Sequence, residues 1–128
     1  MIKKPEDILK KWMNAINKGD IEGILALYSK NAVLIPTFSN RLLNNPREIR
    51  EYFVRLRSRS KLSVSLHDKT LIVRSIKNDM YALFGIYCWL LDIDGEPLRF
   101  EARFSYILDL ALSSPIIHHH SSQIPRML

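Results

Sequence analysis

The sequence predicts an α+β domain in which three N-terminal helices pack on a curved antiparallel sheet and enclose a pocket. Two amphipathic segments at its start carry apolar residues at helical spacing, and a third such segment follows Pro46. From residue 62 onward, apolar residues recur at every second position in several stretches, which is typical of strands. The order shows neither strand-helix-strand alternation nor an internal repeat, so a doubly wound parallel sheet is excluded.

The first two helices have recognisable ends. Pro5 suits the first turn of a helix that ends near Gly19, and Asp20 is a good N-cap for the next helix. The apolar stripe of this second helix stops around Ser29, and a short β segment follows at residues 32–38. We therefore expect a helical hairpin ahead of the first strand.

The remaining strands form the larger part of the predicted sheet. They cover residues 62–66, 70–76, 80–93, 98–110 and 116–122. Asp94-Gly95, between the two long strands, is a strong signal for a tight hairpin turn. The strand at 80–93 is apolar on both faces, which predicts that helices or a pocket cover one face and another subunit covers the other.

Length and composition fit one globular domain over residues 1–128. The chain has 128 residues, of which 47% are hydrophobic and 25% charged. A core of this size needs neither a metal nor a disulfide, so we expect no cofactor. We expect Cys88 to be a small buried hydrophobic residue. The N-terminus lacks an apolar signal core and no apolar run could span a bilayer, which predicts a soluble, cytoplasmic protein without a membrane partner.

The net charge of +6 raises the question of a nucleic-acid partner. Much of the excess lies in the stretch Arg47–Lys61, which would attract phosphate regardless of sequence. This stretch lacks interleaved exposed aromatic residues that could stack on bases. A solvated helix face is therefore the favoured interpretation, and nucleic acid is the weaker alternative.

Polar side chains mark two strands as candidate binding elements. Arg99, Glu101 and Arg103 share one face of the strand at 98–110, and His118 and His120 share one face of the last strand. If these strands pair, arginines and histidines can converge on an anion, because the planar guanidinium matches a carboxylate. The alternative is a solvated sheet face with internal charge pairs.

The His118-His119-His120 tract is a poor metal site, because strand alternation sends His119 to the face opposite its neighbours. The histidine pair can act as an acid or base, or serve structurally. In the strand at 80–93, Tyr87 and Trp89 each combine an apolar body with a hydrogen-bonding tip, so they are candidate pocket walls.

Two stretches resemble a known family. Trp12 to Val33 looks like the opening helix pair and first strand of the association domain of calcium/calmodulin-dependent protein kinase II and its stand-alone bacterial relatives. Ala102-Arg103-Phe104 and Ile117-His118-His119-His120-Ser121-Ser122, closing at Pro125, look like that family's last two strands. The resemblance covers nearly the whole chain and places it in the nuclear transport factor two-like (SnoaL-like) superfamily, with its cone-shaped, cystatin-like fold.

This resemblance implies self-association through the sheet and a deep pocket that holds arginines. Arg103 matches the family's pocket arginine best, Arg74 and Arg99 match it less closely, and His118 and His120 fall on the pocket-lining strand. We therefore expect a homo-oligomeric module that binds a small anionic, carboxylate-bearing molecule. The alternative is a cofactor-free enzyme of the isomerase, dehydratase or cyclase type, for which no catalytic residue stands out and for which Glu101 and Asp92 are the acidic candidates.

Overall fold

The computed structural model describes residues 4–127, so residues 1–3 and 128 of the expected domain lie outside the described chain. Its helices are α1 (Pro5–Lys18), α2 (Ile21–Leu25) and α3 (Pro46–Arg57), with a short 3-10 helix η1 (Asp68–Thr70). Its strands are β1 (Tyr28–Ile35), β2 (Ser63–Leu66), β3 (Ile72–Lys77), β4 (Met80–Ile93), β5 (Glu96–Asp109) and β6 (Ile116–Gln123).

All six strands belong to one sheet. Its order is β1-β6-β5-β4-β2, and β3 also pairs with β4, along the first part of that strand. The pairs among β2 to β6 are antiparallel, whereas β1 runs parallel to β6. The α+β prediction is confirmed, but the sheet is mixed. A parallel pair needs a long connection between its strands, and the chain from residue 36 to residue 115 provides it.

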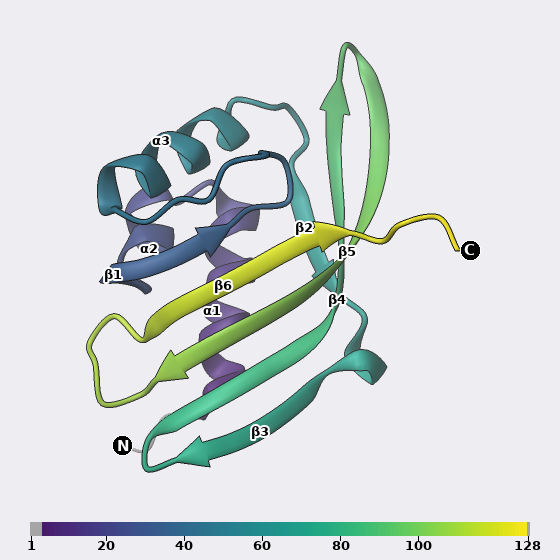
Figure 1. Ribbon diagram of the computed structural model, residues 1–128. Coiled ribbons are helices and arrows are strands. Elements are labelled where there is room, and N and C mark those ends of the chain that lie inside the picture. The colour runs from purple at the N-terminus through teal and green to yellow at the C-terminus, as the bar shows by residue number, and fades with distance from the viewer. Residues whose placement is uncertain (1–3, 128) are drawn as a thin grey trace.

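Helix α1 lies across one face of the sheet, which we call the inner face (Figure 1). The buried stripe of α1 includes Ile8, Trp12 and Ile16, whose helical spacing directs them toward the sheet. The opposite, outer face carries no helix among the described elements, and β4 and β5 bend strongly along their length (Figure 1). Within residues 4–127, no helix has both the length and the hydrophobicity to cross a membrane.

The second helix is shorter than predicted. Asp20 caps it as expected, because its side chain accepts a hydrogen bond from the backbone N–H of Gly23 at 3.0 Å. The helix ends at Leu25, however, and Tyr28 begins β1. Tyr28 pairs there with Ile116 of β6, so sheet pairing overrides the helical spacing of the apolar residues.

The turn between β4 and β5 forms as predicted. Asp94 and Gly95 have φ angles of 52° and 83°, the left-handed values that a two-residue turn of this kind requires. The two strands then stay in register from Met80 opposite Asp109 to Ile93 opposite Glu96. This long hairpin forms the centre of the sheet, because β2 and β3 pair with β4 and β6 pairs with β5.

Asn17 fastens α1 to the edge of the sheet. Its side-chain amide donates to the carbonyl of Val64 at 3.0 Å, and its side-chain oxygen accepts from the N–H of Val64 at 2.7 Å. Val64 lies in β2 and is only 3% exposed. The Asn17 side chain therefore acts as a substitute for a neighbouring strand, because it satisfies both backbone groups of one residue.

Replacing Asn17 with alanine should lower the free energy of unfolding by about 1–3 kcal/mol, because two backbone groups of Val64 lose their partners. Urea denaturation would measure the change. The matched control is Asn14→Ala, an exposed position on the same helix with the same gain in helix propensity, which should shift stability by less than about 0.5 kcal/mol. Equal shifts in the two variants would contradict the role of Asn17.

Candidate functional site

The arginines expected in a pocket lie on the outer face of the sheet. Arg74, Arg99 and Arg103 all have exposed side chains. The neighbours of Arg103 in β5, Ala102 and Phe104, are 0% and 4% exposed and pack on the inner face. Since successive side chains alternate along a strand, Arg103 points away from α1. This corrects the expectation that the arginines meet Tyr87 and Trp89 in one cavity: the apolar side of β5, not its polar side, packs under the helix.

The histidines of β6 divide between the two faces. His118 and His120 lie half-buried on the outer face, and His119 between them is 2% exposed on the inner face. His120 also lines a shallow cavity of about 330 Å³ beside the loop that follows β1. The interior histidine of the tract is therefore His119, which the sequence analysis placed on the opposite face from its neighbours without giving it a function.

His119 holds a buried hydrogen-bond network together. Its Nδ1 lies 2.7 Å from the hydroxyl of Tyr28, and its Nε2 lies 3.1 Å from the hydroxyl of Tyr87. The Tyr28 hydroxyl also accepts a hydrogen bond from Nε1 of Trp12 at 3.0 Å. The imidazole stacks on the ring of Tyr106, with 3.9 Å between centroids. Residues from α1, β1, β4, β5 and β6 thus meet at one imidazole.

One tautomer of His119 satisfies both of its tyrosine contacts. The indole of Trp12 can only donate, so the Tyr28 oxygen accepts from it and the Tyr28 hydroxyl hydrogen is available to His119 Nδ1. A neutral imidazole that accepts at Nδ1 carries its hydrogen on Nε2, which then donates to the Tyr87 oxygen. In this tautomer the hydroxyl hydrogen of Tyr87 donates elsewhere, and the hydroxyls of Ser121 and Thr37 are its neighbours.

Burial keeps every member of the network neutral. It lowers the pKa of His119 well below the ordinary range of an imidazole, and the nearby His118 and His120 lower it further. Burial also raises the pKa of Tyr28, Tyr87 and Tyr106. For Tyr87, the neighbouring hydroxyls of Ser121 and Thr37 partly offset the effect of burial. The phenols therefore act as hydrogen-bonding groups and not as phenolates.

A small cavity, which we call the inner cavity, adjoins this network. Its volume is about 10 Å³. Its walls are aromatic, aliphatic and hydroxyl-bearing: Trp12, Leu34, Pro36, Thr37, Tyr52, Phe53, Tyr87, Trp89, His119 and Ser121. Tyr87 and Trp89 thus do line a cavity. The hydroxyls of Thr37 and Ser121 are hydrogen-bonded to each other.

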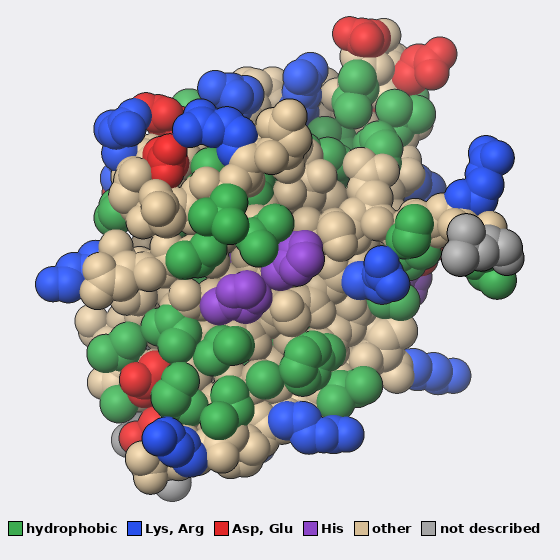
Figure 2. Space-filling model, in the orientation of Figure 1, with side chains coloured by type: hydrophobic (Ala, Val, Ile, Leu, Met, Phe, Trp, Pro, Cys, Tyr) green, Lys and Arg blue, Asp and Glu red, His purple; other side chains and the backbone are tan. Residues whose placement is uncertain are grey.

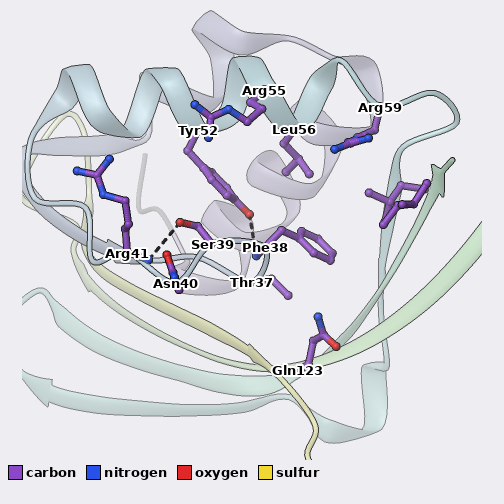
Figure 3. Close-up of a pocket in the computed structure, with 12 residues that line it drawn as sticks. Thr37, Phe38, Ser39, Asn40, Arg41, Tyr52, Arg55, Leu56, Arg59 and Gln123 are labelled. Carbon is purple, nitrogen blue, oxygen red and sulfur yellow. Dashed lines mark hydrogen bonds between the residues drawn. The ribbon is translucent and has the colours of Figure 1, made fainter.

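A larger outer cavity of about 740 Å³ opens above it, between α3 and the loop that follows β1 (Figure 3). Its lining combines aromatic, aliphatic, amide, hydroxyl and guanidinium groups: Thr37, Phe38, Ser39, Asn40, Arg41, Tyr52, Arg55, Leu56, Arg59, Leu91, Ile93 and Gln123. The Tyr52 hydroxyl accepts from the N–H of Phe38 at 3.3 Å, which links α3 to the loop. Figure 3 shows Arg55 and Arg59 on the α3 side, with Gln123 across from them.

The outer cavity is positively charged. None of the described residues that line it is an aspartate or glutamate. Arg41 pairs with Glu48 at 2.9 Å, whereas Arg55 and Arg59 have no carboxylate partner among residues 4–127. The same part of the chain holds no cluster of three or more His, Cys, Asp or Glu side chains that could ligate a metal ion. The arrangement can attract an anion with an apolar body.

The cavity residues of α3 were not predicted, because the basic stretch was interpreted as a solvated helix face. A usable signal was present. Tyr52, Arg55 and Leu56, followed by Arg59, are spaced three, four and seven residues from the first, which places them on one side of a helix. The loop residues Phe38 and Arg41 carry no comparable pattern, since a loop has no fixed period.

Comparisons with known proteins agree with the observed fold. A family model described as a SnoaL-like domain matches residues 6–127. No match was found among curated protein sequences.

Solved structures share the fold over most of their length. A protein from Xanthomonas campestris, provisionally named a calcium/calmodulin dependent protein kinase II association domain, is 26% identical, with a TM-score of 0.84 over 95% of this chain and 86% of its own. A provisionally named dehydratase of the NTF2-like family from Streptomyces avermitilis is 13% identical, with a TM-score of 0.81 over 94% of each chain. A ketosteroid isomerase-like protein from Erwinia carotovora atroseptica is 14% identical, with a TM-score of 0.77 over 94% of each chain.

The buried His119 should make stability depend on pH. The pKa of the His119 imidazole is lowered from 6.5 in the folded protein. Below that pH the imidazole therefore binds a proton in the unfolded chain but stays neutral in the folded chain. This contribution to stability is therefore fully present well above that value, and below it the free energy of unfolding should fall with a slope that approaches about 1.4 kcal/mol per pH unit. Denaturation curves at several pH values would measure this slope.

His119→Gln should lose most of that slope, because glutamine does not titrate. His118→Gln is the matched control: burial lowers the pKa of His118 as well, but its side chain is only partly covered, so most of the slope should remain. An unchanged slope in His119→Gln would show that the dependence arises elsewhere.

Proposed function

The chain belongs to the SnoaL-like domain family, and from this premise we propose that its 128 residues form one cytoplasmic, self-associating domain that binds a small carboxylate in the outer cavity. The observation that carries the proposal is the lining of this cavity, which is cationic and lacks carboxylates among its described residues. No cofactor and no membrane enters the proposal.

The size and the walls of the outer cavity suit a small organic molecule. Its volume of about 740 Å³ is within the usual range of ligand pockets, about 300–1,000 Å³. Phe38 and Tyr52 offer flat aromatic surfaces, and Leu56, Leu91 and Ile93 add aliphatic ones. Such walls favour a ligand with an apolar or aromatic body over a small hydrated anion.

The arginines supply the charge that such a ligand would need. Arg55 in α3 and Arg59 just beyond its end both line the outer cavity, and neither has a carboxylate partner among residues 4–127. A ligand carboxylate would balance these positive charges and accept paired hydrogen bonds from a planar guanidinium. Because both side chains are exposed at the rim, they can bind an anion without paying the desolvation penalty of a buried charge.

Self-association is proposed through the outer face of the sheet. Large apolar side chains are exposed there, with Ile72, Phe84 and Leu90 at 44%, 39% and 37%. Figure 2 shows histidine side chains in the middle of this face with apolar side chains on both sides of them. A second copy would cover this surface, which suits a two-fold, self-complementary contact. The similarity to a protein named as an association domain supports the same proposal.

Enzymatic activity is the second candidate, because similar structures are named as a dehydratase and as isomerase-like. Such a reaction needs a proton acceptor beside the ligand. Both nitrogens of His119 already face tyrosine hydroxyls, and neither cavity has a carboxylate among its described lining residues. Asp92 and Glu101 lie outside both linings. Binding is therefore the function that the geometry favours.

Ion pairs on α3 and α2 argue against a nucleic-acid partner. Arg47 pairs with Glu51 at 3.0 Å, and Arg50 pairs with Glu22 at 2.6 Å. These exposed pairs add little stability, but they reduce the positive potential of the basic stretch. Arg55 of α3 and Arg59 beyond its end line the outer cavity, where a small anion fits better than a polymer backbone.

Benzoate should bind to the native protein, and Arg59→Ala should weaken this binding by about tenfold, because a charge-assisted hydrogen bond is lost. Calorimetric titration at constant ionic strength would measure the affinity. The matched control is Arg103→Ala, which removes the same charge from the outer face of the sheet and should leave the affinity unchanged. Equal weakening by both substitutions, or no saturable binding to the native chain, would contradict the proposal.

The native protein should have a mass in solution of at least twice the 15.0 kDa of one chain. Phe84→Lys should reduce it to that of a monomer, because a lysine ammonium in an apolar interface is costly to desolvate. Light scattering coupled to size exclusion gives the mass. Val54→Lys is the control, since Val54 is 52% exposed on α3, away from the sheet. A native chain that is monomeric at micromolar concentration rules the interface out.

A further inference from the structure

We propose that the inner cavity is a binding site for one carbonyl oxygen of the ligand whose carboxylate the outer cavity holds. The inference deepens the proposed function and rests on it for the carboxylate end of the ligand. It assigns a chemical group to the other end, so the ligand class becomes a small carboxylate that carries a ketone or amide carbonyl remote from its charge.

An unpartnered donor is the first observation. The Nε1 atom of Trp89 is buried and makes no hydrogen bond with the described residues. Its side chain is 2% exposed. The other indole of the chain, that of Trp12, donates to Tyr28 at 3.0 Å. A buried N–H without an acceptor is destabilising, so the Trp89 indole is a group that an incoming acceptor would satisfy.

The inner cavity fits a single oxygen atom. Trp89 is one of its walls, and its volume of about 10 Å³ is close to the space that one water-sized group needs, about 10–15 Å³. Its described lining carries no charged carboxylate, lysine or arginine. A neutral acceptor suits this surrounding better than an ion, because an ion would lose its hydration without gaining an opposite charge.

The hydroxyls around the cavity favour a carbonyl in particular. Tyr87, Thr37 and Ser121 also line it, so hydroxyl groups surround the inner cavity beside the Trp89 indole. A carbonyl oxygen has two lone pairs and no hydrogen, so it can accept from the Trp89 indole and from a neighbouring hydroxyl without introducing a new buried donor.

The two cavities are neighbours, which allows one molecule to reach both. Thr37 and Tyr52 line the outer and the inner cavity alike. Phe38, a wall of the outer cavity, packs edge-on against Trp89 with 5.6 Å between ring centroids. A ligand that lies along Phe38 thus has its charged end at the α3 rim and its other end near the Trp89 indole.

The first test follows the indole hydrogens by NMR. The chain has two tryptophans, so a hydrogen–nitrogen correlation spectrum of labelled protein shows two indole signals, and Trp89→Phe identifies one of them. Para-acetylbenzoate and the neutral ketone acetophenone should both shift the Trp89 signal downfield and leave the Trp12 signal in place. The isosteres para-isopropenylbenzoate and isopropenylbenzene, which carry a methylene group instead of the oxygen, should not. No shift with either carbonyl compound, or the same shift with the isosteres, overturns the inference.

The second test measures affinity. The native protein should prefer para-acetylbenzoate over para-isopropenylbenzoate by about five- to tenfold, the effect of one neutral hydrogen bond to a buried donor. Trp89→Phe should abolish the preference. Tyr106→Phe is the matched control, because its hydroxyl is also buried and unpartnered but does not line the inner cavity, so the preference should remain.

The outcomes separate this inference from the proposed function. If the native protein binds the two benzoates equally and Arg59→Ala weakens both, the carboxylate site stands and the carbonyl site is wrong. If acetophenone shifts the Trp89 signal and the added carboxylate of para-acetylbenzoate brings no gain in affinity, the carbonyl site stands and the carboxylate site is wrong. The comparison of isosteres uses the native chain, so it holds even where Trp89→Phe does not fold.

Discussion

The packing of Trp12 against the inner face of the sheet is the contact on which the rest of this structure depends. Its ring centroid lies 5.2 to 6.0 Å from those of Tyr87, Trp89, Tyr106 and His119. The same indole donates to Tyr28, so one side chain of α1 contacts strands β1, β4, β5 and β6. Both the apolar packing and the buried hydrogen-bond network therefore begin at Trp12, and the inner cavity lies against its ring.

The distribution of charge follows from this packing. Burial lowers the pKa of His119 and raises those of Tyr28 and Tyr87, so the interior contains polar groups without net charge. The guanidinium groups of Arg55 and Arg59 remain at the exposed rim, where water still solvates them. The result is a gradient from a cationic opening to a neutral, donor-bearing interior, and the proposed ligand matches both ends. The fold alone would not specify such a ligand, because this scaffold hosts many chemistries.

Much of the fold was predictable from local signals. Pro5 and Pro46 begin α1 and α3, Asp20 caps α2, and Asp94-Gly95 closes the long hairpin, each at the predicted residue. These features depend on backbone preferences within a few residues, which a single sequence displays. The parallel pairing of β1 with β6 was not predictable in this way, because its partners are about 85 residues apart in the chain and no local pattern encodes their relative direction. Tyr28 was misassigned to a helix for the same reason.

Strand alternation alone makes one face of β5 polar, puts His119 opposite His118 and His120, and puts Tyr87 and Trp89 on a shared face. Which of these faces packs under α1 depends on the folding of the whole chain. Burying the apolar face of β5 removes Phe104 and Tyr106 from water, which is favourable. Burying Arg103 would remove the hydration of its charge, which is costly, so Arg103 lies on the outer face. The cationic residues of the cavity come instead from α3 and the loop after β1, since those elements meet above the inner face only when the whole chain is folded.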